Sequence, residues 1–134
     1  MAYRIEEIEG IGASYAAKLA KAGILTTGDL LGKCATPTGR DAVSRSTGIS
    51  GRLILAWANK ADLLRVKGIG AQYSELLEAA GVGTVKDLRT RVAEHLAARI
   101  KAVNMKKRLV RQVPSQAQVE TWIATAKKLA CRMK

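Results

Sequence analysis

The chain has little of several residue types, and each shortage excludes a class of structure or function. It contains no Phe and only 4% aromatic residues, so aliphatic side chains must fill the interior. With two Pro and no low-complexity run, it lacks the composition of a disordered chain. Acidic residues are also scarce, at 11 against 23 Lys and Arg, which leaves a net charge of +12.

Cysteine, apolar runs and export signals are equally sparse. Cys34 and Cys131 lie far apart with no Cys or His at metal-ligand spacing, which predicts free thiols and neither a disulfide nor a metal site. No apolar run approaches the roughly 18 to 20 residues of a spanning helix, and the start, MAYRIEEIEG, lacks the basic and apolar regions of a signal peptide. We expect a cytoplasmic protein without a membrane partner or a cofactor.

Helix formers and positive charge dominate what remains. Ala, Leu, Lys and Arg are abundant and favour an all-α fold, and 134 residues suit one compact domain in which neither half stands alone. The net charge predicts a polyanionic partner, with nucleic acid favoured over an acidic membrane surface.

A duplicated segment is the most informative pattern. Residues 8–30 align with residues 66–88 without a gap, and 11 of the 23 positions are identical. Both copies contain a Gly-Ile-Gly sequence, an aromatic residue, a helix-stopping Gly and a Thr-x-x-Asp sequence. We therefore predict one structural unit used twice, in residues 1–65 and 66–134, about one core.

Local signals place the helices of each copy. We predict helices over residues 3–8 and 13–22, with Gly23 as the residue that ends the second. Thr26 or Thr27 is the predicted N-cap of the next helix, and Asp29, three residues after Thr26, gives the segment capping-box character. Thr84 and Asp87 repeat this arrangement in the second copy. A further helix is expected to begin at Pro37 after Thr36 and to stop at Gly48.

Each copy ends in a helix with a buried Trp. From Ser50 to about Val66, apolar residues recur at a spacing near 3.6, and Trp57 lies at the centre of the stripe. The same pattern recurs around Trp122 at an offset of 65, so the second copy is seven residues longer, with the extra length between Asp87 and Ser115. We expect residues 8–66 to superpose on residues 66–131 about a pseudo-twofold axis.

The Gly-Ile-Gly segments carry a family resemblance. The pattern apolar-x-Gly-apolar-Gly, followed by a helix with an apolar seventh residue, resembles the helix-hairpin-helix motif of DNA repair nucleases, ligases and Holliday-junction proteins. Ile8 to Leu19 and Val66 to Leu77 both match it. The whole chain further resembles a family of small, mostly bacterial proteins of unassigned function with a duplicated helix-hairpin-helix unit.

The residue types suit phosphate binding. The first glycine permits a tight reversal, the second lets a phosphate approach the backbone, and N–H groups at the start of the next helix bind the anion. The isoleucines should point into the core. In two-motif relatives the paired hairpins grip both strands across the minor groove, which the resemblance implies here. Predicted contacts are Lys67, Gly68, Ile69, Gly70, Ala71 and Gln72 in the second copy, and Gly10, Ile11, Gly12 and Ala13 in the first.

The second hairpin is expected to dominate, because Glu9 occupies the position that Lys67 has in the second copy. The inserted region adds a basic run without an acidic residue between His95 and Glu120, with predicted nucleic-acid contacts at Arg99, Lys101, Lys106, Lys107, Arg108 and Arg111. The alternatives are that the turns only serve packing and that the basic run is a solvated face.

No catalytic arrangement is evident. The acidic residues are dispersed, whereas two-metal nucleases need clustered carboxylates, and Lys60 and Asp62 are interpreted as a solvated pair. The sequence therefore predicts a module, not an enzyme, that binds double-stranded DNA without sequence preference, as an accessory to repair or recombination. The alternatives are a protein-interaction adaptor with the same fold and a small regulatory or scaffolding protein that binds anionic metabolites or RNA.

Overall fold

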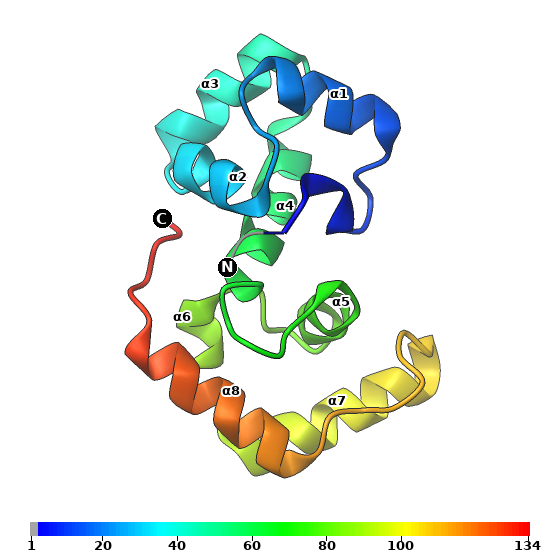
Figure 1. The fold of residues 1–134 in the computed structure, drawn as a ribbon. Helices are drawn as coiled ribbons and strands as arrows, with labels where there is room; N and C mark the ends of the chain where they lie inside the picture. Colours follow the sequence, from blue (N-terminus) through cyan, green and yellow to red (C-terminus); the bar gives the residue numbers. More distant parts are fainter. Residues whose placement is uncertain (1–2) are drawn as a thin grey trace.

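The computed structural model describes residues 3–134, which fold into helices joined by short turns (Figure 1). The only pairing of strand type within these residues is an isolated bridge between Arg4 and Thr26. The predicted all-α fold is confirmed. The elements are the 3-10 helix η1 (Ile5–Glu7) and the α-helices α1 (Ala13–Lys21), α2 (Thr27–Cys34), α3 (Pro37–Thr47), α4 (Gly51–Leu63), α5 (Ala71–Ala79), α6 (Val85–Leu88), α7 (Ala93–Lys107) and α8 (Gln116–Lys128).

The predicted helix starts and stops are confirmed where a specific side chain or glycine defines them. Thr26 accepts the N–H of Asp29, whose carboxylate accepts the N–H groups of Leu25 and Thr26 in return. These backbone hydrogen bonds stabilise the charged form and lower the pKa of Asp29. Thr36 and Thr84 cap α3 and α6 with their side chains, which accept the N–H groups of Gly39 and Asp87. Gly23 and Gly48 follow their helices with positive φ angles of 83° and 74°.

Two helices are shorter than predicted. The first helix is the short η1, and α4 ends at Leu63 because Val66 donates its N–H to the Leu63 carbonyl in the following turn. The extra length of the second half lies in α7, which has 15 residues against 11 in α3, and in the connection that follows it. The expected pseudo-twofold relation between the halves stays a prediction.

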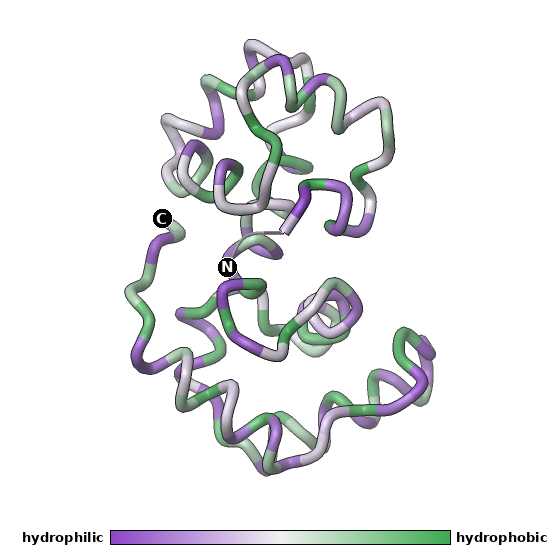
Figure 2. Tube along the Cα trace, in the orientation of Figure 1, coloured by the Kyte–Doolittle hydropathy of each residue, from purple (hydrophilic) through white to green (hydrophobic). Residues whose placement is uncertain are grey.

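The buried apolar side chains form two clusters rather than one continuous core. The N-terminal cluster extends along the chain from Ile5 to Leu64 around Trp57. The C-terminal cluster extends from Leu63 to Ala126 around Trp122. Hydrophobic and hydrophilic positions alternate along the helices, as Figure 2 shows, so each helix has one face to bury. Helix α4 contributes to both clusters, with Trp57 in the first and Leu63 in the second.

Buried charges lie where α4 leads from one cluster to the other. Lys60 of α4 is 8% exposed and forms an ion pair with Glu75 of α5, with Glu78 3.8 Å away. Asp62 is 1% exposed and accepts hydrogen bonds from Arg65 at 2.6 Å and from the Val85 N–H at 2.8 Å. The interpretation of Lys60 and Asp62 as a solvated pair is therefore wrong, because each has a separate partner on a neighbouring segment.

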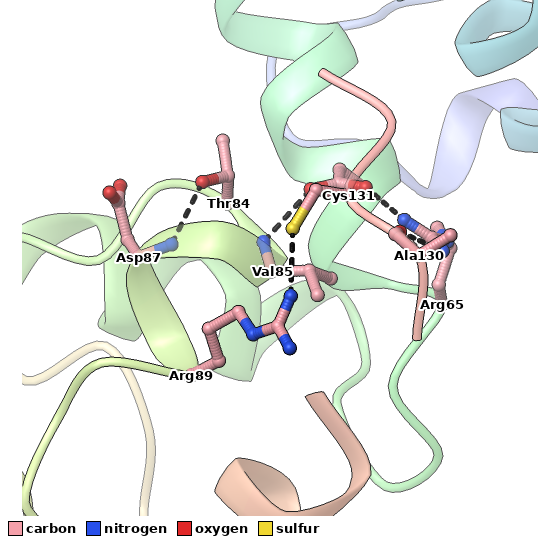
Figure 3. A network of polar contacts seen from close by, with 8 residues as sticks. Arg65, Thr84, Val85, Asp87, Arg89, Ala130 and Cys131 are labelled. Atoms are coloured by element: carbon pink, nitrogen blue, oxygen red, sulfur yellow. Dashed lines mark hydrogen bonds and ion pairs between the residues drawn. The ribbon is translucent and has the colours of Figure 1, made fainter. Parts of the chain in front are cut away.

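The C-terminal segment connects the two halves. Arg65 donates to the Ala130 carbonyl at 2.7 Å, and Arg89 donates to Cys131 Sγ at 3.1 Å (Figure 3). Further on, the Lys134 N–H bonds to the Ala35 carbonyl at 2.8 Å, and Met133 packs against the N-terminal cluster. Cys34 and Cys131 are both free thiols, as predicted, and burial raises the pKa of Cys34.

Removal of one partner of the buried pair between α4 and α5 tests how the halves are joined. Lys60→Met should lower the free energy of unfolding by about 1–3 kcal/mol, because Glu75 is left half-buried and uncompensated. The double variant Lys60→Met, Glu75→Leu should recover most of this loss. Urea unfolding followed by circular dichroism measures both, with the exposed Lys18→Met as the matched control. A double variant as unstable as the single one would contradict the pairing.

Candidate functional site

The two Gly-Ile-Gly segments, here the first turn (residues 10–12) and the second turn (residues 68–70), have the same backbone conformation. Gly10 and Gly68 both have φ of 95°. The isoleucine that follows donates its N–H to the carbonyl three residues back, Ile11 to Ile8 and Ile69 to Val66, at 3.1 Å in both turns. Both isoleucines are buried, at 4% and 0% exposure, so the prediction that they point into the core is confirmed.

The first glycine of each turn lies against a tryptophan. A Cβ on Gly10 would be 3.5 Å from Trp57 Nε1, and one on Gly68 would be 3.0 Å from Trp122 Nε1. Each indole also packs on a tyrosine of the helix that follows the turn, with ring centroids 5.1 Å apart for Tyr15 and Trp57 and 5.2 Å apart for Tyr73 and Trp122. Positive φ makes glycine the suitable residue at both positions, and at Gly68 the short distance to Trp122 adds a steric reason.

The second glycine of each turn faces open space. A Cβ on Gly12 or Gly70 would meet nothing within 4 Å. Both glycines are N-caps that offer no side-chain acceptor, whereas Thr26, Thr36, Ser50, Thr84 and Ser115 cap their helices with a side chain. The first N–H groups of α1 and α5 therefore remain without a side-chain cap at the positive end of the helix dipole.

The charges around the two turns differ. Exposed Glu6, Glu7 and Glu9 immediately precede the first turn, whereas exposed Lys67 precedes the second. A carboxylate beside uncapped N–H groups opposes the approach of an anion, and an ammonium group favours it. The two turns thus have the same backbone conformation but different electrostatic environments.

A cleft of about 920 Å³ opens beside the second turn. One side is formed by the turn and the start of α5, and the other by the end of α7 and the residues after it, which lie well apart in sequence (Figure 1). We call it the hairpin cleft. Its lining residues are Gly68, Gly70, Ala71, Gln72, Tyr73, Asn104 and residues 108–112.

Hydrogen bonds hold the loop of residues 108–112 in place. The Asn104 side chain both donates to the Val110 carbonyl and accepts the Val110 N–H, at 3.0 Å in each case. The Tyr73 hydroxyl donates to the Gln112 carbonyl at 3.3 Å. Arg108 is the one non-glycine residue among residues 3–134 with a positive φ, at 50°, and this left-handed residue ends α7 and turns the chain back.

The structure brings together part of the predicted contact set. Gly68, Gly70, Ala71, Gln72, Arg108 and Arg111 all line the hairpin cleft, whereas Ile69 is buried behind it. Lys67, Lys101, Lys106 and Lys107 are exposed but do not line it. Asn104, Tyr73, Leu109, Val110 and Gln112 were not predicted; an Asn near a helix end, able to bond the backbone beyond it, was the one available signal.

Arg99 lies at the other end of α5. Its Nε donates to the Ala80 carbonyl at 2.7 Å, so it caps the carboxyl end of that helix. Arg91 donates to the adjacent Gly81 carbonyl at 2.9 Å. Arg99 has a structural partner, and the structure does not place it in the hairpin cleft with Arg108 and Arg111.

Beside the first turn, α1 begins at a hollow with a different lining. Ala13 lines this hollow of about 570 Å³, together with other alanines of α1 and with Leu25. Within residues 3–134, no group of three His, Cys, Asp or Glu residues is placed to hold a metal ion. No helix in the same part of the chain is both long and apolar enough to cross a bilayer.

Comparison with known proteins identifies the family of this chain. The model of a family described as Domain of unknown function (DUF4332) matches residues 9–129, which is most of the chain, so the chain belongs to this family. No curated protein and no solved structure matches.

Alanine at the two glycines of the second turn should lower stability by unequal amounts. Gly68→Ala should lower the free energy of unfolding by about 2 kcal/mol, because of its positive φ and the contact with Trp122. Gly70→Ala, with allowed φ and open space, should cost at most about 0.5–1 kcal/mol. Thermal unfolding measures both, and equal losses would contradict the roles given to the two glycines.

Proposed function

We propose that this member of the DUF4332 family is a helix-hairpin-helix protein that binds double-stranded DNA without sequence preference. The observation that carries the proposal is the hairpin cleft, in which the second turn and two arginines of the basic insertion line one space. Residues predicted to bind phosphate from two separate sequence signals are neighbours. The proposal assigns a binding role, with no catalytic step, as a cytoplasmic accessory to repair or recombination.

The groups at the hairpin cleft suit a phosphate. The N–H groups of Ala71 and Gln72 begin α5 without a side-chain cap, and the helix dipole adds partial positive charge there. Arg108 and Arg111 supply guanidinium groups, which bind phosphate oxygens in a bidentate way. Such contacts recognise the backbone and carry no base information.

Helix α7 extends the basic surface away from the cleft. Lys101, Lys106 and Lys107 are exposed on it, and no acidic residue lies between His95 and Glu120. Neutralisation of neighbouring phosphates by these cations would release counterions, so the affinity for DNA should fall steeply as the salt concentration rises. The exposed acids before the first turn make that turn the weaker partner in any grip by both hairpins.

The adaptor function remains the second candidate, favoured by a different surface. The α1 side of the hollow is formed by Ala13, Ala16, Ala17 and Ala20, and Leu25 next to them is 61% exposed. The rest of its lining is Arg4, Ile5, Glu6 and Thr26. An apolar helix face of this kind suits a protein partner. The tryptophans do not contribute to it, because both are buried.

Valine at the second glycine of each turn separates the two hairpins. Gly70→Val should weaken binding to a blunt DNA duplex by about tenfold, the effect of roughly 1.4 kcal/mol, because a branched side chain obstructs the closest approach of a phosphate. Gly12→Val is the matched control and should change affinity little, since Glu9 already opposes an anion there. Fluorescence anisotropy at low salt measures affinity, and circular dichroism checks folding. Equal losses in the two variants would contradict the asymmetry.

The salt dependence tests the basic surface. For the unaltered protein, log K against log salt should have a slope set by roughly four to eight phosphate contacts at about 0.9 each. The triple variant Lys106→Ala, Lys107→Ala, Arg108→Ala should reduce the slope by about one unit per lost contact. If no duplex binds even at low salt, the adaptor function replaces the DNA-binding proposal.

A further inference from the structure

We infer that the hairpin cleft takes a single nucleic-acid strand, with one phosphate at the start of α5 and the adjoining base against Leu109 and Val110. The inference rests on the proposed function and names the form of nucleic acid that the cleft itself accepts. A duplex then places a phosphate at the second turn and meets the exposed cations of α7, whereas an unpaired strand also places a base inside the cleft. The preferred ligand is accordingly DNA with an unpaired segment.

The size of the cleft supports one strand. Its volume of about 920 Å³ falls within the roughly 300–1,000 Å³ of sites that hold small organic ligands. A nucleotide unit is a ligand of that class, whereas a paired duplex presents two backbones and a continuous stack. The loop of residues 108–112 lines the same cleft as the second turn, so a strand that reaches the turn also meets this loop.

The hairpin cleft is lined by both polar and apolar groups, which suits an unpaired nucleotide. Phosphate contacts alone require N–H groups and cations, yet Leu109, Val110 and Tyr73 also line the space and are all partly exposed. Tyr73 is fixed there by its packing on Trp122 and its hydrogen bond to the Gln112 carbonyl. Single-strand sites combine a basic groove with flat or apolar surfaces for bases, and arginine guanidinium groups stack on unpaired bases as well.

The difference in charge between the two turns also supports the binding of a single strand. A grip on both strands of a duplex needs two hairpins that accept phosphate, and Glu6, Glu7 and Glu9 precede the first one. A cleft at one hairpin serves one strand without the other. The second turn can therefore bind a strand without a contribution from the first turn.

Strands with and without bases give the direct test. Three ligands of about 12 units, within the roughly 4 to 16 nucleotides of known single-strand sites, are compared by anisotropy with the full chain: oligothymidine, an abasic strand with the same phosphates, and a blunt duplex. Oligothymidine should bind at least about fivefold more tightly than the abasic strand, the lower range for contact with one base. Equal affinities for those two strands would overturn the inference.

A variant of the apolar wall locates the base contact. Leu109→Ala should remove most of the advantage of oligothymidine over the abasic strand. Leu129→Ala is the matched control, because Leu129 is also half-buried and packs against the same C-terminal cluster but does not line the cleft. Equal losses of oligothymidine affinity in the two variants would show a general loss of packing and contradict the site.

Two further ligands identify the source of the nucleotide. Oligouridine that binds as well as oligothymidine supports the inference, since the cleft would contact phosphate and base in either. Thymidine monophosphate that displaces the strand at a concentration near the strand's own Kd would show a free nucleotide to be the ligand and overturn it. Binding of the blunt duplex alone would refute the inference and leave the proposed function intact, whereas no binding of any nucleic acid would refute both.

Discussion

The contact between a glycine and a tryptophan determines the geometry of each turn. Gly10 and Gly68 reverse the chain with φ of 95° while the indole of Trp57 or Trp122 lies close to where a side chain would begin. The same indole packs on the tyrosine of the following helix. One aromatic residue thus fixes both the turn before the helix and the helix itself, and the buried isoleucine of the turn completes the attachment to the core. The uncapped N–H groups that we assign to phosphate binding are held in place by this packing.

The two turns show how one backbone can carry two chemical environments. Their hydrogen bonds, glycine conformations and ring packing agree closely, and their capping differs from that of most other helices. What separates them lies outside the turns: acids before the first, and a lysine and a basic loop beside the second. The longer α7 and its connection place Arg108 and Arg111 at the second turn, so the insertion explains the asymmetry. The proposed function depends on this difference as much as on the turn.

Local signals in the sequence predicted much of the fold and less of the site. Thr26, Thr36 and Gly48 mark helix ends through contacts within a few residues, so pattern alone located them. Lys60 was misjudged because its partner Glu75 lies on another helix and only the packing of α4 on α5 brings the two together. Arg99 resembled its basic neighbours in sequence, yet its position on α7 directs it to the Ala80 carbonyl. The cleft itself arises from the bonds of Asn104 to Val110 across a turn, which no periodicity encodes.

The central claim is that two turns of equal conformation differ in their affinity for phosphate. The most direct measurement follows the backbone amide resonances of ¹⁵N-labelled protein while a DNA duplex with a single-stranded overhang is added. The account predicts that the amides of Gly70, Ala71 and Gln72 shift progressively, together with those of residues 108–112, while those of Gly12, Ala13 and Ser14 shift little. Equal shifts at both turns, or shifts confined to the exposed lysines of α7 with none at either turn, would contradict it.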